Sequence, residues 1–264
     1  MLSDSFILKL VLAPLIISVA TLVSRRWGSK IGGLMIGLPL TSAPVSIFFT
    51  LEQGRDFAAR AAVGSLLGLI PVAFFCAGYA QASRRLPWYA AASLSISLYF
   101  VTIWGVSLAN PGFWPAAILV PAALALGLWS LKSLDIREVP IPSPHWDLPL
   151  RMAMAAALLI FITTAADRLG PTWSGLLSPF PVMSFVMVTF AHRQAGAPAA
   201  WRFIEGVLTG LFGFYAFFLV VTLLIERVNP ALAYSLATLT ALGVNGVSLA
   251  RVVWTGRSAH ATGY

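Results

Sequence analysis

The chain has 264 residues, of which 59% are hydrophobic and only 10% are charged. Soluble domains carry about 25% charged residues because their surface faces water, so this composition excludes an ordinary soluble protein and indicates that lipid covers most of the surface. The net charge of +8 is typical of a membrane protein whose basic residues stay in cytoplasmic loops, and no nucleic-acid motif accompanies it. Cys76 is the single cysteine, which excludes a disulfide framework and a cysteine-based metal site.

Apolar runs recur along the chain and are separated by short polar breaks. A helix needs about 20 apolar residues to cross a bilayer. We therefore predict an all-α, polytopic membrane protein with about nine transmembrane helices. In chain order, these predicted helices are Ser5–Ser24, Ile31–Leu51, Ala59–Ala80, Trp88–Leu108, Gly112–Leu131, Leu150–Ala166, Thr172–Ala191, Phe203–Ile225 and Ala231–Leu249.

The distribution of basic residues predicts the orientation. Nine spans put the termini on opposite sides, and an N-terminus outside the cell leaves most basic residues in the cytoplasm. The cytoplasmic set is then Arg25, Arg26, Lys30, Arg84, Arg85, Lys132, Arg137, Arg151, Arg193, Arg202, Arg251 and Arg257, and the outer set is Lys9, Arg55, Arg60, Arg168 and Arg227. This bias predicts a periplasmic N-terminus and a cytoplasmic C-terminus.

An internal repeat divides the chain into two units. Residues 26–69 align without gaps with residues 168–211, 142 positions later, and fourteen of the 44 pairs are identical, including glycine, proline, serine and arginine pairs. Five predicted spans precede the second copy, so it would cross the membrane in the opposite direction, as in the inverted repeats of many secondary transporters. We predict a first membrane repeat over 1–133, a cytoplasmic linker over 134–149 and a second repeat over 150–264, with five plus four helices.

A rival topology follows from the prolines in Ile31–Leu51 and Thr172–Ala191. If both segments were re-entrant hairpins, the chain would cross seven times and the repeats would be parallel. That count leaves ten basic residues inside and seven outside, a poorer separation, so nine spans are favoured.

The proline-containing helices are the candidate site. A proline inside a helix deletes one hydrogen bond and clashes with the carbonyl four residues earlier, so Pro39 should free the carbonyl of Met35, and Pro181 that of Leu177. At about 1.5 Å per residue, both breaks fall near the middle of a hydrocarbon core roughly 30 Å thick. There, a freed carbonyl must find protein or a water-lined cavity.

A helix that restarts at such a break offers unpaired N–H groups, which favour an anionic group. Ser42 with Pro44, or Ser178 with Pro179, would begin such a helix well. The alternative is that these segments are only kinks eased by hydroxyl groups. The candidate binding residues are Pro39, Thr41, Ser42, Pro44, Ser46, Ser178, Pro179, Pro181 and Ser184.

Other residues have simpler interpretations. The pairs Gly64/Gly68 and Gly206/Gly210 have the spacing of close helix packing. Glu205 is best read as an i,i+3 partner of Arg202, although Glu205 or Asp167 could couple transport to an ion because buried carboxylates are rare in this chain.

The stretch GLLSPFPVMSFVMVTFAHRQAG, from Gly175, resembles the GlpM family of small bacterial inner-membrane proteins, which are about half as long. The resemblance covers Gly175–Gly210 and its first-half equivalent Gly33–Gly68. It implies a multi-pass protein of the bacterial inner membrane and carries no established chemistry. Ile36 and Gly37 stand where the second half has Ser178 and Pro179, so the two breaks should differ in detail.

Enzymatic motifs are absent from the sequence, including HExxH, paired aspartates and a P-loop, so we expect no catalytic residue, metal or cofactor. The first hypothesis is a secondary transporter, exporter or flippase for a small or amphipathic, anionic solute, working by alternating access. The second is an accessory subunit of an envelope or polymer-export complex, acting as a homodimer or with a partner membrane subunit. A membrane enzyme is the third.

Overall fold

The computed structural model describes residues 18–40, 42–109, 111–131, 148–154 and 180–261, together with Leu15 and Ala157. Within these ranges the chain is helical and contains no strand, which confirms the all-α class. A helical segment over residues 18–27 comes first. The helices after it are α2 (Ser29–Ile36), α3 (Ser42–Gln53), α4 (Arg55–Leu67), α5 (Leu69–Ser83), α6 (Trp88–Ala109), α7 (Phe113–Ser130), α10 (Val182–Leu224) and α11 (Pro230–Ala261).

Among the described residues, five helical stretches are long and apolar enough to cross a membrane. A helix of 22 residues such as α6 is about 33 Å long, which matches a hydrocarbon core of roughly 30 Å. The chain therefore has the helices expected of an integral membrane protein. The five stretches are Arg55–Ser83, Trp88–Ala109, Phe113–Ser130, Val182–Leu224 and Pro230–Ala250.

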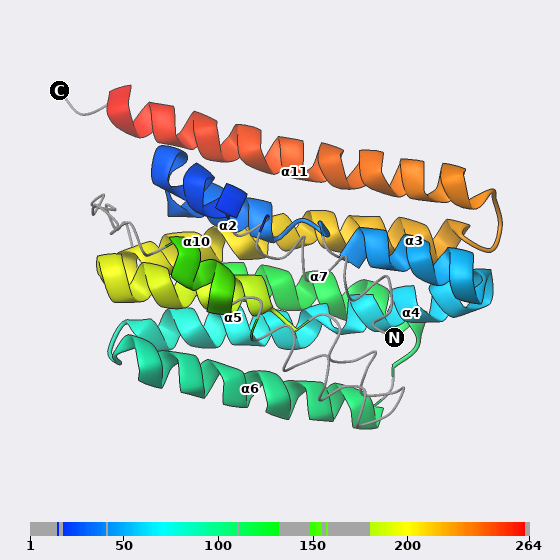
Figure 1. Cartoon of the computed structure of the whole chain (residues 1–264), viewed down its shortest axis with the longest axis horizontal. Coiled ribbons are helices and arrows are strands. Elements are labelled where there is room, and N and C mark those ends of the chain that lie inside the picture. The colour runs from blue at the N-terminus through cyan, green and yellow to red at the C-terminus, as the bar shows by residue number, and fades with distance from the viewer. Residues whose placement is uncertain are drawn as a thin grey trace.

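The other four predicted spans are not seen as single long helices in the described residues. Ile31–Leu51 consists of two short helices, α2 and α3, which follow one another along the length of the molecule (Figure 1). Most of Ser5–Ser24, most of Leu150–Ala166 and the first half of Thr172–Ala191 lie outside the described residues. The count of nine therefore stays a prediction.

Two glycines mark sharp corners of the chain. Gly54, between α3 and α4, has φ 87° and ψ 173°, and Gly196, inside α10, has φ 77° and ψ −174°. A positive φ is easily adopted only by glycine. Figure 1 shows that the chain turns back on itself at both places, so that α10 is two arms. The two corners lie 142 positions apart in sequence and at opposite ends of the molecule.

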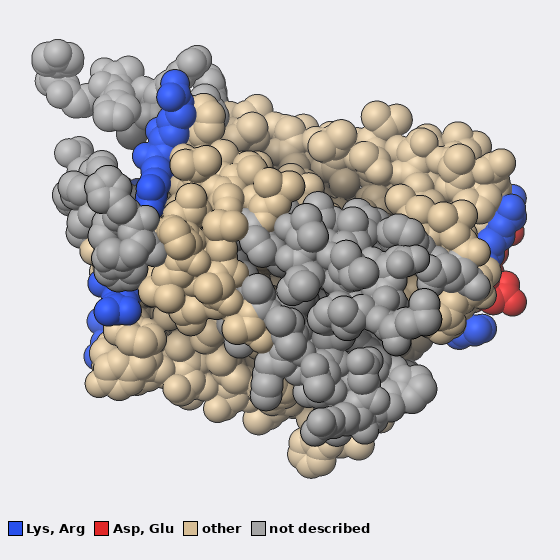
Figure 2. All heavy atoms as spheres, in the orientation of Figure 1, with Lys and Arg blue, Asp and Glu red and all other residues tan. Residues whose placement is uncertain are grey.

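Charged side chains gather at those two ends. In Figure 2, lysines and arginines lie at both ends of the long axis, acidic residues lie at one end, and the described surface between them on this face is uncharged. The end that holds the α5–α6 turn carries Arg84 and Arg85, whereas the other holds the α3–α4 and α10–α11 turns (Figure 1). An uncharged band between two charged ends is the surface that a membrane-embedded bundle requires.

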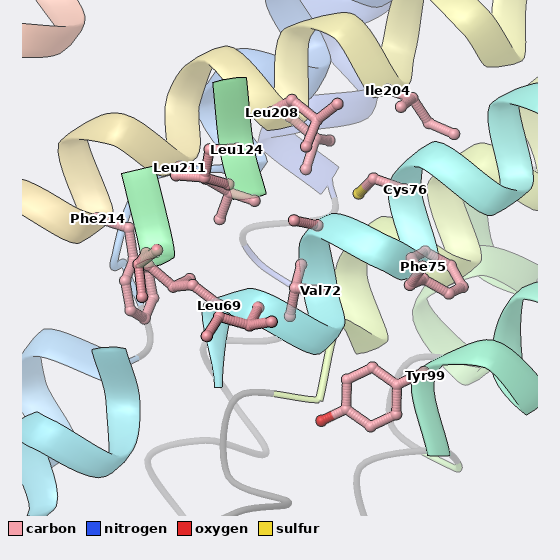
Figure 3. Close-up of a cluster of buried hydrophobic side chains, with 14 of the residues drawn as sticks. Leu69, Val72, Phe75, Cys76, Tyr99, Leu124, Ile204, Leu208, Leu211 and Phe214 are labelled. Carbon is pink, nitrogen blue, oxygen red and sulfur yellow. The ribbon is translucent and has the colours of Figure 1, made fainter. Parts of the chain in front are cut away.

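The core joins the two halves of the chain. Side chains of α5 and of the second arm of α10 interdigitate, and residues of α6 and α7 close the cluster, among them Tyr99 and Leu124 (Figure 3). Leu69, Phe75 and Cys76 come from α5, whereas Leu208 and Phe214 come from α10. Neither half buries this surface by itself.

A second contact between the halves is made by backbone. Helix α2 crosses α10 so closely that a Cβ atom added to Gly33 would overlap the carbonyl oxygen of Phe203, and one added to Gly206 would overlap that of Lys30. The same holds one turn along, where Gly210 lies against Leu34. Small residues permit such approaches in membrane helices. We call this contact the glycine seam.

Candidate functional site

The first proline turn separates α2 from α3. The N–H of Leu40 donates to the carbonyl of Leu38 (2.8 Å), and that of Ala43 donates to the carbonyl of Pro39 (2.8 Å). The carbonyl of Met35, which the sequence predicts to be free, accepts from the N–H of Leu38 at 3.2 Å. The chain itself therefore satisfies this carbonyl with a tight terminal turn.

The second proline turn precedes α10 and repeats the same bonds. Here the N–H of Val182 donates to the carbonyl of Phe180 (2.8 Å), and that of Phe185 donates to the carbonyl of Pro181 (2.7 Å). Each of these four residues lies 142 positions after its counterpart in the first turn. The two breaks thus share their local backbone pattern as well as their prolines.

This pattern leaves a donor at the start of α10. The first turn of any helix has N–H groups without an intrahelical partner. In α10 the first intrahelical bond runs from the N–H of Phe185 to the carbonyl of Pro181, the N-cap, so the N–H of Ser184 precedes it. Within the described part of the chain, the Ser184 N–H donates to no backbone carbonyl of the turn. It can therefore serve an anionic group.

The serines differ in their surroundings. Ser184 is buried, with 6% of its surface exposed, whereas Ser42, the first residue of α3, is half-buried. In Figure 1 the α2–α3 connection and the start of α10 both lie near the middle of the long axis. Pro44 is the third residue of α3. Four of the candidate residues, Thr41, Ser178, Pro179 and Asp167, lie outside the described residues.

Ser46, in the first half of α3, belongs to a different arrangement. The Ser46 hydroxyl lies 2.9 Å from the hydroxyl of Tyr234, a residue of α11. The Tyr234 hydroxyl also donates to the backbone carbonyl of Ser46, at 2.7 Å. The Thr50 hydroxyl lies 2.7 Å from the same tyrosine oxygen. All three side chains are buried. This cluster ties α3 to α11, and sequence reasoning missed Tyr234 and Thr50 because helix spacing does not identify a partner helix.

Glu205 forms an ion pair with Lys30, across the glycine seam, with 2.5 Å between Oε1 and Nζ. The sequence suggested a local partner, Arg202, but did not indicate Lys30. The two side chains are 34% and 22% exposed, so the pair sits at the rim of the bundle rather than deep inside it.

The four packing glycines are not equivalent. Gly206 and Gly210 lie against α2 in the seam, whereas a Cβ added to Gly64 would meet nothing within 4 Å in the described structure. Gly68 stands between α4 and α5 with helical backbone angles. Gly206 and Gly210 therefore pack against α2, which contributes Gly33 to the same contact.

Tyr99 is a further polar residue at the second proline turn that sequence reasoning missed. Its side chain on α6 is fully buried, and its ring packs edge-on against Phe180, with 5.0 Å between the centroids. Figure 3 shows the hydroxyl oxygen pointing away from α6, beside the chain that leads into α10. This hydroxyl has no hydrogen-bond partner among the described residues. In the sequence Tyr99 is only an aromatic residue within an apolar span, and that pattern does not distinguish a binding residue from a core residue.

No group of three His, Cys, Asp or Glu side chains that could hold a metal ion occurs in the described ranges. No family model matches the chain, and neither a curated protein nor a solved structure does.

Proposed function

We propose that this chain is a secondary transporter of the bacterial inner membrane, which moves a small or amphipathic solute by alternating access around its two proline turns. The observation that supports this most is the recurrence of one backbone pattern in two helices, at Pro39 and at Pro181. Broken helices in paired repeats form the midplane sites of many secondary transporters.

The proposal includes an inverted duplication with nine spans. Its support is the constant offset of 142 positions, which relates the two turns and also the positive-φ corners Gly54 and Gly196. The same offset relates the starts of α6 and α11, at Trp88 and Pro230. Because the two corners lie at opposite ends of the bundle (Figure 1), the units would cross the membrane in opposite directions.

The proposed solute carries a negative charge. The free N–H at Ser184 and the partial positive charge of a helix start favour an anionic group at mid-depth. By the bias of basic residues, the end that carries Arg84 and Arg85 would be cytoplasmic, with the C-terminus on the same side. The bacterial location follows from the resemblance to the GlpM family.

Accessibility of the two turns tests the transporter. Replacing Cys76 with serine removes the single native thiol, and single cysteines are then placed at Ser42 or Ser184. An impermeant maleimide is applied to right-side-out and inside-out vesicles. Alternating access requires each thiol to react from both sides, to extents that change with conditions favouring one state.

A matched position supplies the control. A cysteine at Leu239, which is 65% exposed on α11, faces the proposed lipid and should react from neither side. If the thiols at 42 and 184 behave in the same way, the transport pathway is wrong. An accessory subunit of an envelope complex would then be the better proposal, because such a subunit needs no water-accessible pathway through its interior.

A further inference from the structure

We propose that Tyr99 and the first turn of α10 form a subsite for the anionic group, a carboxylate or a phosphate, of the transported solute. This inference rests on the proposed function, because it names the part of the site that would recognise the solute. The Tyr99 hydroxyl and the N–H of Ser184 are its donors.

Two independent observations meet at this place. One is the start of α10, where the first helical bond is made by Phe185 and the N–H of Ser184 donates to no backbone carbonyl within the described chain. The other is the fully buried Tyr99 hydroxyl, which has no described partner. The contact between the Tyr99 and Phe180 rings places the Tyr99 side chain against the residue that precedes Pro181.

A buried hydroxyl without a partner costs stability, because it loses its bonds to water and gains none. Replacement by phenylalanine would keep the ring contacts and remove that cost. A tyrosine at this position is therefore expected if a ligand uses the hydroxyl. Tyr215 differs from Tyr99 in this respect, because its hydroxyl donates to the carbonyl of Ala117 at 2.8 Å.

The first test measures charge preference. The full chain with Cys76→Ser and Ser184→Cys is reconstituted in liposomes and treated with two methanethiosulfonate reagents of similar size, one a sulfonate and one a trimethylammonium. Each rate is divided by the rate with free cysteine in solution. The subsite predicts that the sulfonate reacts faster, and that Tyr99→Phe lowers this preference by about threefold to tenfold, the effect of one hydrogen bond. Tyr215→Phe should leave the preference unchanged.

The second test does not depend on whether a reagent reaches the thiol at position 184. The subsite requires the melting temperature of Tyr99→Phe, in detergent without solute, to equal or exceed that of the parent, whereas Tyr215→Phe should melt lower. A lower melting temperature for Tyr99→Phe would assign the hydroxyl to the fold and overturn the subsite.

The outcomes separate the two proposals. If Ser184→Cys reacts but shows no preference for the sulfonate, or a preference that Tyr99→Phe does not change, the subsite is wrong while the pathway stands. If neither Ser184→Cys nor Ser42→Cys reacts from either side, the pathway and the subsite fall together.

Discussion

Lys30 and Glu205 form an ion pair across the glycine seam, with 2.5 Å between Nζ and Oε1, although 175 positions separate them in sequence. Both side chains are partly exposed at 22% and 34%, and ion pairs in contact with solvent contribute only about 0–1 kcal/mol. We expect Glu205→Gln to lower the free energy of unfolding by no more than about 1 kcal/mol. Unfolding in detergent with increasing denaturant measures this.

The charge-swapped pair is the control for that prediction. Lys30→Glu alone places two carboxylates together and should destabilise more than Glu205→Gln, whereas Lys30→Glu with Glu205→Lys should recover most of the loss. No recovery in the double variant would show that the two groups do not interact in the folded protein.

The glycine seam predicts unequal effects of two alanine substitutions at repeat-related positions. A Cβ at Gly206 would overlap the backbone of α2, which cannot yield as a flexible side chain does, so we expect Gly206→Ala to cost about 1–3 kcal/mol. Gly64→Ala meets nothing in the described structure and should be neutral or stabilising by up to about 1 kcal/mol, through helix propensity. Thermal unfolding of both variants measures the difference. Equal losses would mean that α2 and α10 are farther apart at Gly206 than the overlap of an added Cβ with the Lys30 carbonyl indicates.

The hydroxyl cluster at Tyr234 predicts a specific coupling. Tyr234→Phe removes the bonds to Ser46 and Thr50 and should cost about 1 kcal/mol. Thr50→Val should cost less, and the double variant should fall short of the sum because both changes break one bond. Tyr89→Phe, at a tyrosine 58% exposed, is the matched control and should change nothing. Strict additivity would argue against a direct bond.

The two corners predict labelling from opposite sides of the membrane. Asp56 and Arg193 are exposed beside Gly54 and Gly196, respectively. In the Cys76→Ser background, an impermeant maleimide should reach Asp56→Cys only from the periplasmic side and Arg193→Cys only from the cytoplasmic side. Labelling of both from one face would contradict the inverted topology.

The sequence alone predicts those elements whose ends carry strong local signals. The positions of the breaks at Pro39 and Pro181 follow from proline chemistry, and the span beginning at Trp88 follows from a polar break before a long apolar run. The corner at Gly196 lay in the predicted gap between two spans. These features depend on neighbours in the chain.

The partners between helices could not be predicted in the same way. Lipid is as apolar as leucine, so apolar residues occur on every face of a membrane helix and their spacing does not show which face is inward. That is why Lys30 was not recognised as the partner of Glu205, nor Tyr234 as that of Ser46. The sequence groups Ser46 with the midplane serines, whereas in the fold its hydroxyl contacts Tyr234 of α11.

The seam between α2 and α10 has a consequence for biosynthesis. A ribosome adds about 5–20 residues per second, and Glu205 lies 175 positions after Lys30, so α2 is made roughly 9–35 s before its partner. During that interval its glycine face meets lipid, and the early half is open to capture by insertion factors or proteases. Slower translation ahead of α10 would lengthen the time for which α2 has no partner.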